Sequence, residues 1–137
     1  MIKDLVHDPM FLGIKSKPAD KNDIQVGQDL LETLIAHRET CVGMAANMIG
    51  VTKCVIAFND NGNYVVMYNP EIVGKSGGFQ TEESCLSLLG APRPTTRYKN
   101  IRVKYQDNLF KWKTANYTGF TAQIIQHEID HCNGVLI

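Results

Sequence analysis

A five-residue pattern near the end of the chain constrains the fold most strongly. His127-Glu128-Ile129-Asp130-His131 matches H-E-x-x-H and lies in the segment Gly119 to Asn133, which has no internal glycine or proline. Gly134 follows as a suitable C′ residue, so we expect a helix over this segment. Histidines four residues apart lie one helical turn above each other and can bind one metal ion, with Glu128 within reach of a metal-bound water.

The apolar positions of this helix indicate which way the histidines point. Phe120, Ile124, His127 and His131 follow at i, i+4, i+7 and i+11, so we expect them to share one core-facing stripe. Two inward-pointing imidazoles need polar partners, and a metal ion would satisfy both. The alternative is a pair of interior histidines with other hydrogen-bond partners.

The third protein ligand stays open on spacing alone. A catalytic metal site of this kind takes three protein ligands and leaves one position for water. Cys132 follows His131 directly, but on a helix it is turned well off the histidine face. Cys85 is slightly favoured, because it stands in an extended segment beside polar and acidic residues. The remaining candidates are isolated and are typical of surface histidines and small buried thiols: His7, His37, Cys41 and Cys54.

The rest of the chain predicts an α+β fold, with strands grouped in the middle and helices near the two ends. Asp23 to His37 is an amphipathic helix with a Leu-rich core face, and Asp23 is its expected N-cap. Lys53 to Phe58 and Tyr64 to Asn69 flank an Asn/Gly-rich turn and predict a hairpin. Further extended segments are expected at Ile72-Val73, Glu83 to Leu88, Ile101 to Gln106 and Phe110 to Trp112.

Length and charge exclude several classes of protein. The 137 residues, 44% of them apolar, predict one domain over residues 1–137. Basic and acidic residues balance at 14 each, so we expect no direct binding of nucleic acid or of an anionic membrane. The apolar runs are far shorter than the roughly 20 residues that span a bilayer, and the N-terminus has no signal-peptide pattern. We therefore expect a cytoplasmic protein, and a monomer.

Three blocks in order resemble the peptide deformylase family. The family pattern G-x-G-x-A-A-x-Q corresponds to C-V-G-M-A-A-N-M at residues 41–48, and E-G-C-x-S corresponds to E-S-C-L-S at residues 83–87. The third, Q-H-E-x-D-H, is intact at residues 126–131. The resemblance extends over almost the whole length of the chain.

This resemblance implies a fold in which antiparallel sheets pack around a central metal-binding helix, with a further helix near the N-terminus. It makes Cys85 the third ligand beside His127 and His131, and Glu128 the proton-transfer group. The implied metal is Fe²⁺, with Zn²⁺, Ni²⁺ or Co²⁺ as substitutes. The implied reaction removes the N-formyl group from the initiator methionine of nascent polypeptides and releases formate, so N-formylmethionyl peptides at the ribosome are the expected partners.

Other polar residues near the ligands are candidates for orienting them. Glu83, Gln126 and Asp130 belong to the same two blocks as the ligands, and carboxylate or amide partners commonly hold metal-ligating side chains in place. The sequence does not say which of them bonds to which ligand.

The resemblance also assigns the groups that stabilise the developing oxyanion. The backbone N–H after the cysteine ligand belongs to Leu86. The second family donor is the glutamine amide of the first block, and Met48, whose thioether donates no hydrogen bond, stands in its place. Asn47 carries an amide, but in a helix its side chain would point about 100° away from that of Met48. Loss of one oxyanion donor typically costs about 10²–10³ in kcat.

Further departures concern the substrate cleft. The resemblance places Val42, Gly43 and Ser84 where the family brings its backbone close to the substrate. Ser84 and Cys41 replace family glycines, so either side chain could narrow the cleft, whereas Gly43 is retained. Leu89 occupies a position where many relatives carry proline.

Three hypotheses follow. The chain is a working deformylase with altered oxyanion and cleft residues, a related amidohydrolase acting on another small N-acyl or N-formyl substrate, or a protein that binds metal or formyl peptide without useful turnover. A zincin-like protease shares H-E-x-x-H, but Cys85 in its block argues against that class.

Overall fold

The computed structural model describes residues 1–88 and 90–137, so Leu89 lies outside the described residues. The described elements, in chain order, are α1 (Pro9–Leu12), η1 (Lys21–Asp23), α2 (Ile24–Ala36), β1 (Gly43–Ala45), η2 (Ala46–Ile49), β2 (Val55–Asp60), β3 (Asn63–Glu83), β4 (Arg93–Gln106), β5 (Trp112–Thr118) and α3 (Gly119–Cys132). The grouping of strands between helices confirms the expected α+β class. None of the described helices has the length and apolar character needed to cross a membrane.

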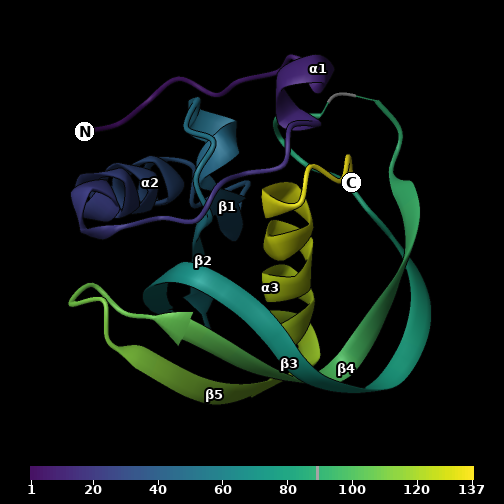
Figure 1. Cartoon of the computed structure of the whole chain (residues 1–137). Helices are drawn as coiled ribbons and strands as arrows, with labels where there is room; N and C mark the ends of the chain where they lie inside the picture. Colours follow the sequence, from purple (N-terminus) through teal and green to yellow (C-terminus); the bar gives the residue numbers. More distant parts are fainter. Residues whose placement is uncertain (89) are drawn as a thin grey trace.

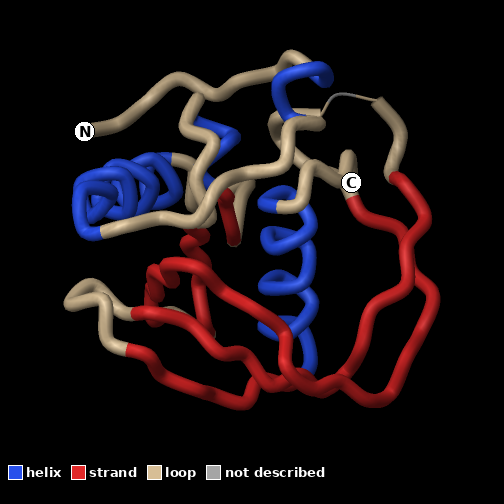
Figure 2. Tube along the Cα trace, in the orientation of Figure 1, coloured by secondary structure: helices blue, strands red, loops and turns tan. Residues whose placement is uncertain are grey.

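The strands form one antiparallel sheet in the order β1-β2-β3-β4-β5. Strands β3 and β4 are long, with 21 and 14 residues. Together with β5 they curve around α3, which lies in the concavity of the sheet (Figures 1 and 2). Two register shifts in the β3–β4 pairing, after Tyr68 and after Ile72, interrupt the ladder and allow this bend. The sheet therefore surrounds the helix that carries the histidines.

The predicted hairpin is confirmed, but the strands beyond it are longer than predicted. Asn61 and Gly62 have φ values of 50° and 100°, as a two-residue type I′ turn requires. From there β3 continues without a break to Glu83, whereas the residues after Glu83 are not in a strand, so the extended segment expected up to Leu88 is wrong. Strand β5 begins at Trp112, because a loop held by the Asp107 carboxylate occupies the residues before it.

Helix α2 begins at Ile24 with Asp23 at its N-cap position, as expected, and packs against β1, β2 and β3. Leu30 and Leu34 are fully buried. Gly27 leaves room for the Tyr68 ring, whose hydroxyl donates to the Ile24 carbonyl at 3.0 Å. This contact anchors the helix on β3.

Helix α3 confirms the predicted helix, including its C-terminal glycine, because Gly134 has φ +74°. Ile124, His127 and His131 are buried as the stripe predicts. Phe120 is the exception: it is 65% exposed, because it lines a cavity beside α3 and does not pack into the core. Between α3 and the concave face of the sheet lies an apolar core that includes Ile56, Phe58, Met67, Ile101, Val103, Ile125 and Ile129.

Candidate active site

The two histidines and Cys85 converge on one point. The Nε2 atoms of His127 and His131 lie 3.1 Å apart, and both side chains are buried. Cys85 approaches from the segment that follows β3. Its sulfur and the ligand atoms of both histidines all lie within 4.8 Å of one another. This spacing and donor set fit one tetrahedral metal ion with a fourth position for water.

The two histidine rings differ in how readily they take up a proton. Burial, together with the charge of the neighbouring His127, lowers the pKa of His131 to about 3, so its ring is neutral and offers a lone pair. Burial opposes the charging of His127, but contacts with Cys85 and Glu83 outweigh it and raise the pKa of His127 to about 10. A metal ion and a proton therefore compete for His127.

A buried ionic network orients His127. Its Nδ1 donates to Glu83 Oε1 at 2.8 Å, which directs Nε2 at the metal position. Arg97 donates to both oxygens of Glu83 and, at 2.7 Å, to Asp130 on α3, while Gln123 donates to Glu83 at 2.8 Å. Burial disfavours the charged carboxylate, but hydrogen bonds from His127, Arg97 and Gln123 lower the pKa of Glu83 to about 2. Glu83 is therefore an ionised acceptor at neutral pH.

The three candidates for orienting the ligands thus have different positions. Glu83 contacts a ligand directly, and Asp130 acts on Glu83 through Arg97. Gln126 instead exchanges two hydrogen bonds with the Tyr98 backbone, at 2.9 and 2.8 Å, and so fixes α3 against β4.

Sequence reasoning missed Arg97 and Gln123. A signal for Arg97 was present in the sequence. Arg97 lies an even number of residues from Ile101 and Val103, so on one strand all three side chains point to the same, inner face of the sheet. A buried arginine needs acidic partners nearby to pair with its charge.

Glu128 lies beside the metal position. Its side chain is 4% exposed, and its Oε1 has no hydrogen-bond partner among the described residues. Burial raises the pKa of Glu128 to about 7, although the charge of His127 opposes this. A Cβ at Gly43 would lie 2.9 Å from Glu128 Oε2 and 2.7 Å from Ile124 Cγ2. Gly43 therefore leaves the space that the Glu128 carboxylate occupies.

Met48, which stands at the position of the family's oxyanion glutamine, brings no amide to the pocket. Met48 lines it, is 1% exposed, and accepts the Ala45 N–H through its sulfur at 3.4 Å. Asn47 is fully buried and donates its amide to the carbonyls of His131 and Leu12, at 3.0 and 3.4 Å. Asn47 is not among the described residues that line the pocket, so it does not replace the missing donor.

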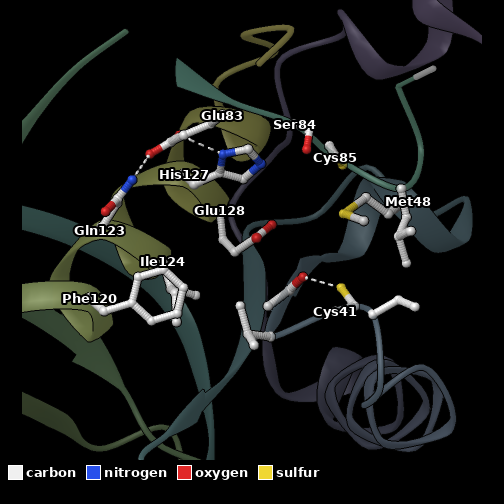
Figure 3. A pocket seen from close by; sticks show the side chains of 14 residues that line it. Cys41, Met48, Glu83, Ser84, Cys85, Phe120, Gln123, Ile124, His127 and Glu128 are labelled. Atoms are coloured by element: carbon white, nitrogen blue, oxygen red, sulfur yellow. Dashed lines mark hydrogen bonds and ion pairs between the residues drawn. The ribbon is translucent and has the colours of Figure 1, made fainter. Parts of the chain in front are cut away.

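A cavity of about 250 Å³ brings these groups together (Figure 3). Its lining contains every residue expected to act in catalysis or substrate binding: Val42, Gly43, Met48, Ser84, Leu86 and Glu128. Cys85 and His127 also line it, whereas His131 lies fully buried behind them. Phe120, Gln123, Ile124 and Cys41 complete much of the wall. In Figure 3 the sulfur atoms of Met48 and Cys85 and the Glu128 carboxylate face the same space.

The free groups around the cavity suit a carbonyl substrate. No hydrogen bond within the described part of the chain uses the Leu86 N–H. The Cys41 thiol donates to the Gly43 carbonyl at 3.0 Å, and burial raises the pKa of Cys41 to about 12, so it stays protonated. The arrangement can hold a metal, accept a proton at Glu128 and donate one backbone hydrogen bond to an oxygen.

Comparison with known proteins agrees with this geometry. The polypeptide deformylase family model matches residues 5–137. A peptide deformylase from Clostridium beijerinckii is 53% identical over 137 residues, which is 100% of both chains. The crystal structure of a peptide deformylase from Legionella pneumophila is 33% identical, with a TM-score of 0.87 over 99% of this chain and 83% of that one. A class I type b peptide deformylase from Acinetobacter baumannii, in a crystal structure bound to Met-Ala-Ser, is 28% identical, with a TM-score of 0.87 over 99% of this chain and 97% of that one.

The structural matches confirm the expected fold. The family match spans all three sequence blocks, and the full-length identity to the clostridial enzyme is high. The chain therefore belongs to the peptide deformylase family.

Proposed function

We propose that this chain hydrolyses the N-formyl group of formylmethionyl peptides, with Cys85, His127 and His131 as metal ligands and Glu128 as the proton-transfer group. The observation that carries the proposal is the convergence of three ligand atoms beside a buried, unpaired carboxylate in an open pocket. Such a constellation is typical of metal-assisted hydrolysis.

The walls of the cavity suit a peptide that begins with methionine. Phe120, Ile124 and Val42 offer apolar surface for an unbranched thioether side chain. Gly43 and Ser84 also line the cavity, and we propose that extended peptide backbone passes beside them. The Acinetobacter baumannii relative holds Met-Ala-Ser, a peptide with the same first residue as the proposed product.

The chemistry follows from the positions of the side chains. A divalent metal held by Cys85, His127 and His131 would supply a Lewis acid and lower the pKa of a water molecule. Glu128 Oε1, which has no hydrogen-bond partner among the described residues, would accept the proton that a water molecule loses on attacking the formyl carbon. The C–N bond then breaks, and Glu128 returns the proton to the leaving amine. The products are formate and a peptide with a free amino terminus.

One oxyanion donor is retained and one is missing. The Leu86 N–H is free to donate to the formyl oxygen, whereas Met48 offers only a thioether. We therefore propose a working enzyme whose chemical step is slower than that of a relative with glutamine at this position.

The metal, the partners and the setting belong to the same proposal. A thiolate beside two imidazoles suits Fe²⁺, with Zn²⁺, Ni²⁺ or Co²⁺ as substitutes. We propose that a monomeric, single-domain protein acts in the cytoplasm on nascent peptides at the ribosome. The balance of 14 basic and 14 acidic residues is consistent with the absence of direct nucleic-acid binding.

The decisive experiment combines metal content with formate release from formyl-Met peptides. Glu128→Gln keeps the size of the side chain but removes its basicity. We expect formate release to fall by about 10²–10⁴ while the metal content stays unchanged. Glu82→Gln, at an exposed carboxylate near the end of β3 and outside the cavity lining, is the matched control and should retain full activity. Metal-loaded wild type that releases no formate at high enzyme concentration would disprove the proposal.

Met48 also motivates a second candidate, a deformylase-like amidohydrolase acting on another small N-acyl amine. The thioether makes this part of the cavity wall apolar, so it could accept an acyl group larger than formyl. A panel of N-acyl methionyl peptides separates the two functions, because a clear preference for a non-formyl substrate would favour the second. Tight binding of formyl peptide without hydrolysis would instead indicate a binding protein.

A further inference from the structure

A histidine that the proposed reaction does not use reaches the segment that carries the metal-binding cysteine. His7 precedes α1, and its ring nitrogen Nδ1 lies 3.1 Å from the Ser87 carbonyl oxygen, 80 positions away in the chain. Because a carbonyl oxygen only accepts, Nδ1 carries the proton and donates in this hydrogen bond. In Figure 1 the N-terminal segment passes above α2 to α1, and this contact joins it to the chain that follows β3. Spacing in the sequence indicated only a surface histidine at this position.

Residues 85–88 have few other constraints. They lie outside any helix or strand, and one backbone hydrogen bond among them joins the Leu88 N–H to the Cys85 carbonyl at 3.2 Å. Apart from the Cys85 sulfur, which faces the histidines of the metal site, the His7 ring makes the only hydrogen bond between this segment and the rest of residues 1–88 and 90–137. Leu88 is buried, but apolar packing has no preferred direction. The His7 hydrogen bond therefore sets the orientation of this segment.

The burial of Ser87 increases the weight of this one hydrogen bond. Ser87 is fully buried, and its hydroxyl has no hydrogen-bond partner among the described residues. A buried carbonyl oxygen without a donor is strongly disfavoured. Loss of the His7 imidazole should therefore make the segment move until water reaches the Ser87 oxygen.

His7 is exposed to solvent, yet its backbone is held on both sides. The Val6 N–H donates to the Met48 carbonyl at 2.8 Å, and the Asp8 side chain caps the N-terminus of α1. Met48 and Cys85 both line the cavity. The adjacent residues Val6 and His7 therefore fix two parts of the cavity lining with respect to each other.

We propose that His7 is a positioning residue of the active site. Its imidazole holds residues 85–88, so that the Cys85 sulfur stays at the metal position and the Leu86 N–H stays available to the substrate oxygen. Ser87 is one residue from Leu86 and two from Cys85, so a shift of its carbonyl displaces both groups. His7 itself is not among the described residues that line the cavity. The role of His7 in turnover rests on the proposed function, whereas its role in metal binding does not.

Two substitutions separate the hydrogen bond of His7 from its bulk. His7→Asn places an amide nitrogen where Nδ1 stands, because both atoms are bonded to Cγ, and so keeps the donor. His7→Leu keeps most of the volume and removes the donor. His37→Leu is the matched control: the His37 ring also bonds to a backbone carbonyl, that of Thr33 at 2.9 Å, but at the end of α2 and outside the cavity lining.

Metal binding is measured by titrating the metal-free protein with zinc and with cobalt. We expect His7→Leu to weaken zinc binding roughly 10–100-fold. It should also change the visible absorption of the cobalt-loaded protein, because this absorption depends on the geometry of the thiolate and imidazole ligands. The kcat of formate release should fall by about 10–100-fold with little change in KM. His7→Asn and His37→Leu should behave as wild type in all of these assays.

Several results would overturn the proposal. One is a His7→Leu protein with wild-type zinc affinity, cobalt spectrum and kcat, even if it unfolds at a lower urea concentration, since a purely structural bond has that effect. Others are a His7→Asn protein as impaired as His7→Leu, or equal losses in His37→Leu. If wild type releases no formate, the proposed function fails, but zinc affinity and the cobalt spectrum still decide the role of His7. His7→Ala supplies the same comparison if the leucine variant does not fold.

Discussion

Replacing Met48 with glutamine tests how the cavity limits catalysis. The Met48 sulfur accepts the Ala45 N–H at 3.4 Å, so the carbonyl oxygen of a glutamine can take over this bond while its NH₂ group points into the cavity. A preorganised oxyanion donor is worth about 3–4 kcal/mol in the transition state. Burying a new amide costs about 1–3 kcal/mol when it lacks a partner in the free enzyme. We therefore expect Met48→Gln to raise kcat by about ten- to a hundredfold.

The same reasoning predicts an opposite effect on stability. Because Met48 is 1% exposed, the buried amide should lower the free energy of unfolding by about 1–3 kcal/mol. The assay follows formate release over a range of formyl-Met-Ala-Ser concentrations, so that kcat and KM are obtained separately, and unfolding is followed in urea.

Met48→Leu is the matched control for this experiment. Leucine keeps the apolar volume but supplies no donor, so its kcat should stay near that of wild type. If Met48→Gln retains its metal and its fold but turns over no faster than Met48→Leu, then a missing oxyanion donor does not limit this enzyme. A lower KM with an unchanged kcat would lead to the same conclusion, since oxyanion stabilisation acts in the transition state.

Three other changes test the surrounding structure. Arg97→Met should lower the free energy of unfolding by about 3–5 kcal/mol, because the buried Glu83 carboxylate loses its arginine partner and keeps only the hydrogen bonds from His127 and Gln123. The variant should also weaken metal binding roughly 10–100-fold. Denaturation and metal titration check both effects, and wild-type metal affinity would show that the network does not orient the ligands. Gly43→Ala should lower kcat with little change in metal content, because the new Cβ displaces the Glu128 carboxylate; unchanged kinetics would contradict the close packing. Burial raises the pKa of Tyr117 to about 12, so the folded protein holds the Tyr117 proton more tightly than the unfolded chain does. The contribution of Tyr117 to stability is therefore complete below about pH 10 and is lost as the pH rises towards 12. Urea unfolding across this range should show the loss, and Tyr117→Phe should reduce it.

The metal helix could be predicted because its signals are local. The spacing of His127 and His131, the absence of internal helix breakers and Gly134 all act within one segment. The hairpin at Asn61-Gly62 is predictable for the same reason. Only Phe120 departs from the pattern, because it lines the cavity and does not pack into the core.

The long strands could not be predicted from local preference. Gly74, Gly77 and Gly78 indicate breaks when the sequence is considered alone. In the structure β3 runs through all three, because pairing with β4 satisfies its backbone over residues 71–83. Tertiary pairing outweighs local propensity here.

The site shows the same division between local and distant signals. Sequence spacing identifies His127, His131 and Glu128, but Cys85 was favoured chiefly by the family resemblance. Arg97 was missed because its partners, Glu83 and Asp130, are 14 and 33 positions away in the chain. Only the fold brings an arginine on β4 between an acid on β3 and an acid on α3.

The Asn47 contact has a consequence for how the metal centre is assembled. Its amide joins the His131 carbonyl across 84 positions and the Leu12 carbonyl across 35, while Glu83 meets His127 across 44. Contacts of such long sequence separation form late, because the entropy of closing the intervening loops opposes them. We therefore expect the last turn of α3 to exchange its amide hydrogens only with global unfolding, so that a partly folded copy cannot hold the metal.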